Sequence, residues 1–301
     1  MAFYDRNEQH QYFLEQSRYE IATAVLYGIS FLAGLAVCVL AFIKLRGGSL
    51  GHGFATWLRL ACIFFTLSCM LGMCANALSS PLVHQAGTGE QEYSLDRLFK
   101  QNEAAQYMRL IASWFHHVTQ GILFIAIVTF CAATSATTGS KVWLVVVYVL
   151  GSVLNGLAAA MFALGVKQNR NNFDNKFATI SLFLTLRDVT LAFDCIMAAA
   201  ALFAAGFAVS RLSKSMHIND KPAKLAALAS ILLLLSALYQ LSVLVNYSWV
   251  NPPHFGVPNY LSILGMIFDT WALLGATALV FVAGKNWAEG GSMKQQKGSV
   301  A

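Results

Sequence analysis

The chain has 301 residues, of which 57% are hydrophobic and only 11% are charged. Soluble domains carry about 25% charged residues, so this composition argues against a soluble globular protein and favours one compact membrane domain. The formal net charge is +6 at pH 7, but the basic residues lie beside apolar segments, which indicates signals of membrane topology and no nucleic-acid partner.

Seven apolar segments are long enough to cross a bilayer as helices, since about 30 Å of hydrocarbon needs about 20 residues. None of them shows the alternation of a β-barrel strand. The sequence therefore predicts an all-α fold, a polytopic membrane protein built as a seven-transmembrane-helix bundle. In chain order the predicted spans are 21–43, 54–78, 108–133, 142–166, 181–209, 224–248 and 259–283.

These spans divide the chain into three parts. A polar N-terminal segment covers 1–20, the seven-helix membrane domain covers 21–283 and a short tail covers 284–301. Ten Lys and Arg residues flank the spans on one side of the membrane and eight on the other. This bias favours an N-terminus that is outside or lumenal and a C-terminus in the cytosol, in the endoplasmic reticulum or the plasma membrane.

The connection between the second and third spans, 79–107, is the longest one. Within it Leu95, Leu98, Phe99 and Ala105 recur at roughly helical spacing. We expect a separate helix there, lying on the membrane surface over one mouth of the bundle.

Small residues recur inside several spans, where they allow helices to approach closely. The alanine-rich run 198–208, the pair Ala272 and Ala276 and the pair Gly151 and Gly156 are examples. They predict helix packing and carry no chemistry.

Polar side chains from five spans fall at one level of the membrane. Counted from the face at which the third, fifth and seventh spans begin, they lie about 11 to 20 Å deep. Hydrocarbon penalises polar groups that face lipid, so we expect them to converge on an internal pocket that opens to the outer or lumenal face. The residues are His116, His117, Gln120, Asn155, Asp194, Gln240 and Asp269.

Aromatic residues lie at matching levels and complete the predicted binding set. We assign substrate binding to Gln120, Asn155, Gln240, Trp114, Phe193, Phe268 and Trp271. Each polar residue could instead join two helices through a hydrogen bond worth about 0.6 kcal/mol. The two aspartates are the stronger candidates, because a carboxylate at the centre of a span costs about 2.5 to 3.5 kcal/mol on insertion scales.

The sequence predicts no cofactor and no metal site. No HxxxH or HxxEH spacing is present, and His116 and His117 point about 100° apart on a helix. All six cysteines fall inside apolar segments, so no loop carries a pair of thiol ligands.

In size and span count the chain resembles the small seven-span membrane terpene cyclases of fungal secondary metabolism. The resemblance concerns layout, because the N-x-x-W-E stretch of that family is absent and the second span reads FATWLRLACIFFTLSCMLGMCANAL. It implies a membrane-embedded enzyme for an isoprenoid or meroterpenoid-like substrate, with Asp269 in place of the family's late aspartate. The layout equally resembles uncharacterised seven-span fungal membrane families.

An enzyme is the first functional hypothesis, namely acid-initiated cyclisation of a lipophilic substrate delivered by the bilayer. A carboxylic acid in a pocket of low dielectric constant can stay protonated at neutral pH, and aromatic faces can stabilise a carbocation. Asp194 or Asp269 would be the acid, and His116 or His117 would orient it or remove the final proton.

A receptor or sensor is the alternative hypothesis. Seven spans with an outside N-terminus resemble the layout of G-protein-coupled receptors, with a ligand in an outer-leaflet pocket and a G protein as a possible partner. A mobile basic cytosolic face at 211–224 would then be expected. The D/E-R-Y and NPxxY motifs of those receptors are absent, however. A transporter is disfavoured because the chain shows no convincing internal repeat.

Overall fold

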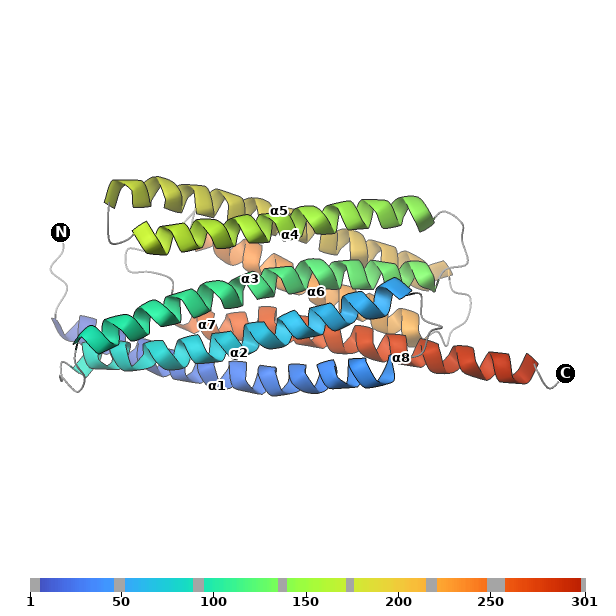
Figure 1. Ribbon diagram of the computed structural model, residues 1–301, viewed down its shortest axis with the longest axis horizontal. Helices are drawn as coiled ribbons and strands as arrows, with labels where there is room; N and C mark the ends of the chain where they lie inside the picture. Colours follow the sequence, from blue (N-terminus) through green and yellow to red (C-terminus); the bar gives the residue numbers. More distant parts are fainter. Residues whose placement is uncertain are drawn as a thin grey trace.

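The computed structural model describes residues 6–45, 52–88, 95–134, 140–171, 176–214, 221–247 and 258–298. The described residues form helices that run side by side along one axis (Figure 1). In chain order they are α1 (Arg6–Lys44), α2 (His52–Thr88), α3 (Leu95–Ala133), α4 (Ser140–Asn171), α5 (Lys176–Lys214), α6 (Lys221–Val245), α7 (Tyr260–Gly265), the π-helical segment η2 (Met266–Trp271) and α8 (Ala272–Gly298).

The helices α7, η2 and α8 follow one another without a break and count as one span. Among the described residues, seven helices are then long and apolar enough to cross a membrane. The predicted all-α seven-helix bundle is confirmed, and the chain is an integral multi-pass membrane protein by this criterion. The terminal parts predicted at 1–20 and 284–301 include residues 1–5 and 299–301, which lie outside the described residues, as does 215–220 within the basic connection 211–224.

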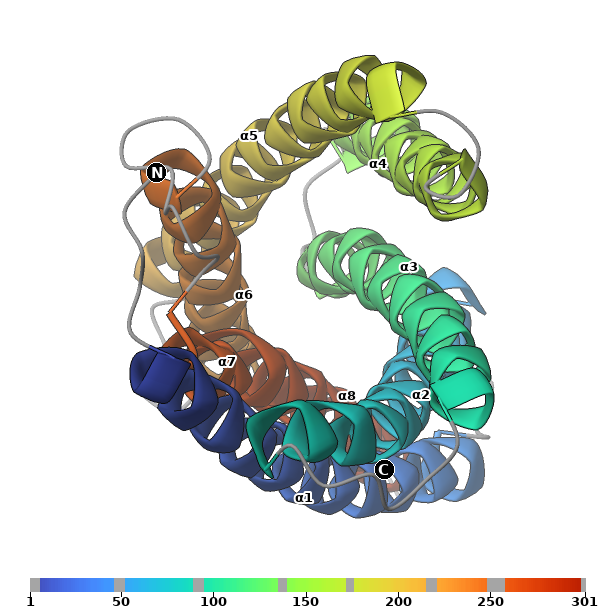
Figure 2. The same ribbon diagram turned by 90° about the vertical axis from the view of Figure 1, so that its left-hand side faces the viewer.

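Helix α3 is the central element of the bundle. In its most apolar window 89% of the residues are buried, against 22% for α1 and 28% for α4 and α6. Figure 2 shows α4 and α5 on one side of α3, and α1, α2 and α8 on the other. Polar side chains on α3 therefore face protein on most sides, which makes this helix the natural support for an internal site.

Small residues set the spacing of the helices, largely as the sequence predicts. Ala272 and Ala276 are buried, and so are five alanines of the run 198–208. A Cβ atom at Gly151 would lie 2.4 Å from Cδ1 of Ile125, so α4 approaches α3 closely there. Gly156 has nothing within 4 Å of its Cβ position. The prediction of a packing role for Gly156 was therefore wrong, because that face of α4 is open.

The predicted surface helix in 79–107 is also wrong, because Leu95 begins α3 itself. That helix has 39 residues and is about 58 Å long, well beyond the hydrocarbon thickness. Leu98 is 1% exposed and Phe99 is 63% exposed, so the inner and outer faces of α3 continue through this region. The stretch 95–107 contains neither proline nor glycine. Nothing therefore ends the helix, and its apolar spacing belongs to the extension of the span.

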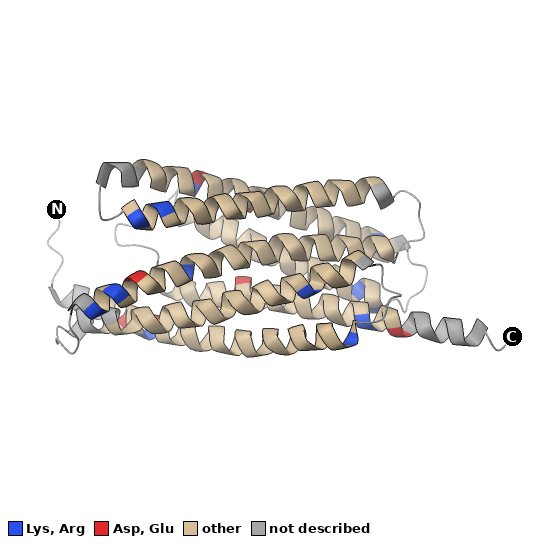
Figure 3. Cartoon of the chain, in the orientation of Figure 1, with Lys and Arg blue, Asp and Glu red and all other residues tan. Residues whose placement is uncertain are grey.

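Charged residues gather towards the two ends of the bundle, with few along its middle (Figure 3). Arg59, inside the second span, donates a hydrogen bond from Nη2 to the backbone oxygen of Leu45 at 2.8 Å. An arginine that binds a carbonyl at a helix C-terminus satisfies a group the helix leaves without a partner. Arg59 thus satisfies a backbone carbonyl at the end of α1.

Candidate functional site

The Asp269 carboxylate is the point at which three elements meet. On the α3 side, Nε2 of His116 lies 2.9 Å from Oδ2 and 3.0 Å from Oδ1 of Asp269. On the α6 side, the Ser236 hydroxyl donates to Oδ1 at 2.5 Å, and Nε2 of Gln240 donates to Oδ2 at 2.9 Å. Gln120 adds a longer contact from Nε2 to Oδ1 at 3.5 Å. Both oxygens are thus occupied by donors.

Two pairs of residues at i, i+4 spacing produce this convergence. His116 and Gln120 share one face of α3, and Ser236 and Gln240 share one face of α6, because residues four apart on a helix are neighbours. Asp269 itself lies in the π-helical segment Met266–Trp271. Single π-helical turns are rare and are frequent at functional sites.

The geometry also fixes the chemistry of His116. Its Nε2 faces a carboxylate and must carry a proton, so a neutral His116 has its free lone pair on Nδ1. Nδ1 makes no hydrogen bond with any described residue. Asp269 therefore orients the imidazole as the buried aspartate does in a Ser-His-Asp triad. The side chains of His116 and Asp269 are 12% and 16% exposed, so solvent has limited access to the pair.

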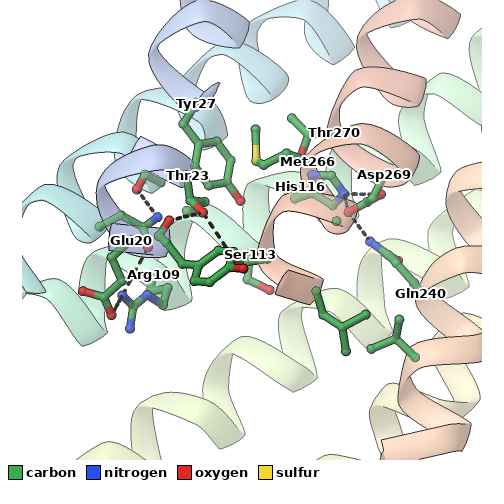
Figure 4. A pocket seen from close by; sticks show the side chains of 18 of the residues that line it. Glu20, Thr23, Tyr27, Arg109, Ser113, His116, Gln240, Met266, Asp269 and Thr270 are labelled. Carbon is green, nitrogen blue, oxygen red and sulfur yellow. Dashed lines mark hydrogen bonds and ion pairs between the residues drawn. The ribbon is translucent and has the colours of Figure 1, made fainter. Parts of the chain in front are cut away.

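His116, Asp269 and Gln240 line the inner end of a pocket of about 530 Å³. Its walls come from α1, α2, α3, α6, α7 and η2, at the end of the bundle where α3 and α7 begin. Figure 4 shows Thr23, Tyr27 and Ser113 between this inner end and the rest of the pocket. The volume falls within the range of about 300 to 1,000 Å³ typical of small-molecule sites. We call this space the main pocket.

An ion pair between α1 and α3 lies at the other end of the main pocket (Figure 4). Nη2 of Arg109 is 3.8 Å from Oε1 of Glu20, with side-chain exposures of 47% and 13%. Ser79 of α2 bridges the pair, since its hydroxyl donates to Oε2 of Glu20 at 2.9 Å and accepts from Nη2 of Arg109 at 2.9 Å. Arg109 and His116 are seven residues apart on α3, which is about 10 Å.

Asp194 lies near His116 and Asp269 but does not line the main pocket. Its residue is only 3% exposed, and it makes no hydrogen bond with a described residue. It is close enough to His116 and Asp269 to interact with both electrostatically. Its neighbour Phe193 is fully buried and packs edge-on against His117, with ring centroids 4.7 Å apart.

Asn155 takes part in helix packing and does not reach the carboxylate. Its Nδ2 donates to the backbone oxygen of Gly151 on the same helix at 2.8 Å. Its Oδ1 is buried without a hydrogen-bond partner among the described residues. The side chain lies against Gly121 of α3, about 3.5 Å from the Cβ position of that glycine.

None of the four predicted aromatic residues lines the main pocket. Phe268 is exposed and stacks on Tyr239, and Trp271 is exposed and donates from Nε1 to the Ser30 hydroxyl at 3.1 Å. Trp114 lies elsewhere and stacks on Phe162. The aromatic residues of the main pocket, besides its histidines, are Tyr19, Tyr27 and Tyr239.

A second pocket of about 190 Å³ lies between α3, α4 and α5. We call it the side pocket. Trp114 lines it, and Ser113 and His117 line both pockets.

The sequence analysis missed Ser236, which donates to Asp269, and the pair Glu20 and Arg109, which lines the main pocket. The i, i+4 spacing of Ser236 and Gln240 was a usable signal for the first. An acid just inside the first span was a signal for the second. Among the described residues, no group of three or more His, Cys, Asp or Glu residues is placed to hold a metal ion.

Comparison of the chain with family models, with curated proteins and with solved structures found no match.

Proposed function

We propose that this protein binds a small molecule with a hydroxyl or amino group in the main pocket, as a membrane receptor or sensor does. The observation that carries the proposal is the inner end of the pocket, where Nδ1 of His116 and Oε1 of Gln240 lie beside the Asp269 carboxylate without hydrogen-bond partners among the described residues. The following contacts support it.

The inner end is rich in acceptors that the protein leaves unused. Gln240 gives its amide nitrogen to Asp269, and its Oε1 is buried without a partner among the described residues. His116 likewise gives Nε2 to Asp269 and keeps Nδ1 free of described partners. A buried acceptor without a hydrogen bond costs about 1 to 3 kcal/mol, so a ligand that donates a hydrogen bond there is favoured.

The remaining wall has both apolar and polar residues. Ala112, Val243, Leu261 and Met266 line it, and so do Thr23, Asn76 and the ion pair of Glu20 and Arg109. Sites for small molecules combine apolar surface with polar groups that fix orientation. The ligand class is therefore a small amphipathic molecule with a donor group at one end. The pocket lies at the end of the bundle that the Lys and Arg bias assigns to the outside or lumen, which suits a ligand arriving from that side.

Binding of hexanol and hexylamine to the purified protein in detergent tests the proposal and separates the two donor groups. At least one of them should raise the thermal unfolding temperature, because a ligand that binds only the folded state stabilises it. In Gln240→Met the affinity should fall about tenfold, the equivalent of one hydrogen bond of about 1.4 kcal/mol. Thr277→Val is the matched control, since the Thr277 hydroxyl bonds only to Leu273 of its own helix. Equal stabilisation of wild type and Gln240→Met would contradict the proposal.

Proton transfer is a second candidate function, and the orientation of His116 by Asp269 favours it. A histidine held in one tautomer with a free ring nitrogen facing a pocket is suited to general acid–base catalysis. Since Asp269 accepts hydrogen bonds on both oxygens, His116 would exchange the proton with the substrate and Asp269 would hold the ring. The absence of Trp114, Phe193, Phe268 and Trp271 from the wall of the main pocket gives carbocation cyclisation less support than proton transfer.

Lipid extracts of cells that produce the protein distinguish catalysis from binding. An enzyme should leave a compound in whole membranes that disappears in Asp269→Asn, because the amide no longer holds the imidazole in a single tautomer. A binding protein should leave the composition of the membranes unchanged, while a compound that copurifies with wild type is lost from Asp269→Asn. A compound that wild type and Asp269→Asn produce in equal amounts would exclude the catalytic role.

A further inference from the structure

We propose that the side pocket is a second compartment of the same binding site and takes the apolar end of the ligand. The inference rests on the proposed binding function of the main pocket. It extends that function by assigning the ligand two parts, a donor group at His116 and Gln240 and a ring or short hydrocarbon segment between α3, α4 and α5.

The first argument is continuity between the two pockets. Ser113 and His117, one turn apart on α3, line both of them. The two pockets lie on either side of α3, and the side chains of Ser113 and His117 form their common boundary. Nδ1 of His117 lies 2.6 Å from the backbone oxygen of Ser113, which holds the ring beside the boundary.

The second argument is the chemistry of the side pocket. Leu110, Met161, Phe162 and Leu186 give it an apolar wall, and no Asp, Glu, Lys or Arg among the described residues lines it. Its volume of about 190 Å³ exceeds that of the engineered apolar cavity of about 150 Å³ that binds benzene. The compartment is therefore large enough for one ring or a short chain.

The third argument is the aromatic wall of the side pocket, to which Trp114 of α3 contributes its indole ring. The indole stacks against Phe162 of α4, with ring centroids 5.2 Å apart. A rigid aromatic wall of this kind favours contact with a flat or extended apolar group.

A series of n-alkanols from ethanol to decanol, bound to the protein in detergent, tests the inference. In wild type the affinity should rise about fourfold for each methylene that enters an apolar compartment. Ala158 of α4 is 1% exposed and lines the side pocket. In Ala158→Leu the short alkanols should bind with the same affinity as in wild type. The affinity should then stop rising at a shorter chain length than in wild type, because the added side chain fills the side pocket.

Two further variants keep the result interpretable if Ala158→Leu folds poorly. Ala159→Leu makes the same change at the next residue, which is exposed and lines neither pocket, and should behave as wild type. Met161→Ala enlarges the side pocket, so it should strengthen binding of the longest alkanols and leave ethanol unaffected.

The outcomes separate this inference from the proposed function. If short alkanols bind but neither Ala158→Leu nor Met161→Ala alters the dependence on chain length, the side pocket is not part of the site. If the full dependence on chain length persists in His116→Phe, the side pocket binds hydrocarbon by itself, as it would a bilayer lipid chain, and the two pockets are not one site. If no alkanol or alkylamine binds wild type at all, the proposed function fails with it.

Discussion

Asp269 shows how a single carboxylate is kept within the membrane-spanning part of the bundle. Its cost on insertion is about 2.5 to 3.5 kcal/mol, and the donors that surround it offset that cost. His116, Ser236 and Gln240 each lie within 3.0 Å of one of its oxygens. Removal of one donor should therefore weaken the whole cluster, because the remaining charge is buried.

Ser236→Ala is predicted to destabilise the protein by about 1 to 2 kcal/mol, since a hydrogen bond to a charged acceptor is lost. Ser230→Ala is the matched control. Both serines are fully buried on α6, but the Ser230 hydroxyl bonds only to the backbone oxygen of Ala227 on its own helix. Reversible unfolding in mixed detergent micelles measures both changes. Similar losses for the two variants would show that the contact with Asp269 is not the cause.

Glu20 and Arg109 should be energetically coupled through Ser79. In a double-mutant cycle of Glu20→Gln and Arg109→Met, we expect a coupling free energy of about 0.5 to 1 kcal/mol, kept small because Arg109 is half exposed. Unfolding measurements of the two single variants and the double variant provide the value. Additive losses would mean that the ion pair contributes nothing to the link between α1 and α3.

At the residue level, the sequence grouped polar side chains of similar depth but did not separate those that meet at Asp269 from Asn155 and Asp194, which do not. His116, Gln120, Gln240 and Asp269 could be grouped from their depth alone, because a helix has a fixed rise per residue. Depth does not give rotation about the helix axis. Asp194 shares the level of Asp269 and yet reaches neither pocket. Ser236 was missed because the hydroxyl of a serine in an apolar span can instead donate to a backbone oxygen of its own helix, as Ser230 does to Ala227.

At the level of the elements, the apolar spans were predictable and the ends of the helices were not. Hydropathy reports the part of a helix that lies in hydrocarbon. The polar turns beyond it stay helical wherever no proline or glycine intervenes, as at the start of α3. Pro81 lies inside α2 without ending that helix, which agrees with the tolerance of spanning helices for proline.

Close approach of α8 to α2 gives a prediction at this scale. A Cβ atom at Gly284 would lie 2.6 Å from Cε1 of Phe54, a buried ring that is held against Phe130 at 5.0 Å. Gly284→Ala should therefore cost about 1 to 3 kcal/mol of stability through overpacking. Gly156→Ala, at an open position of α4, should be neutral or stabilise by up to about 1 kcal/mol. Thermal unfolding of both variants in detergent checks the contrast, and an equal response would contradict the packing argument.

For the whole molecule, the orientation in the membrane decides from which side a ligand enters. The Lys and Arg bias predicts that the main pocket opens to the outside or lumen. Ser262 is exposed and lines this pocket, so Ser262→Cys should react with a membrane-impermeant thiol reagent added outside intact cells if the protein is in the plasma membrane. Wild type measures the background from the six native cysteines. Labelling that requires permeabilised cells would indicate that the pocket opens to an organelle lumen or to the cytosol. Labelling of intact isolated organelles then distinguishes the two, because only a cytosolic opening is accessible to the reagent in them.

The π-helical turn has a consequence for the direction in which the side chains of the last span point. The backbone between Met266 and Trp271 accommodates its residues in a wider coil than the α-helix on either side. Deletion of Ile267 would let regular α-helical winding run through. Because the wide turn holds one extra residue, the helix before and after it would keep its phase, while the side chains of the turn itself would change direction. One lost codon would thus change the direction of the Asp269 side chain while leaving the hydropathy of the span almost unchanged. Hydropathy is enough to predict the seven spans. It does not detect the one extra residue in the last span on which the position of the Asp269 carboxylate depends.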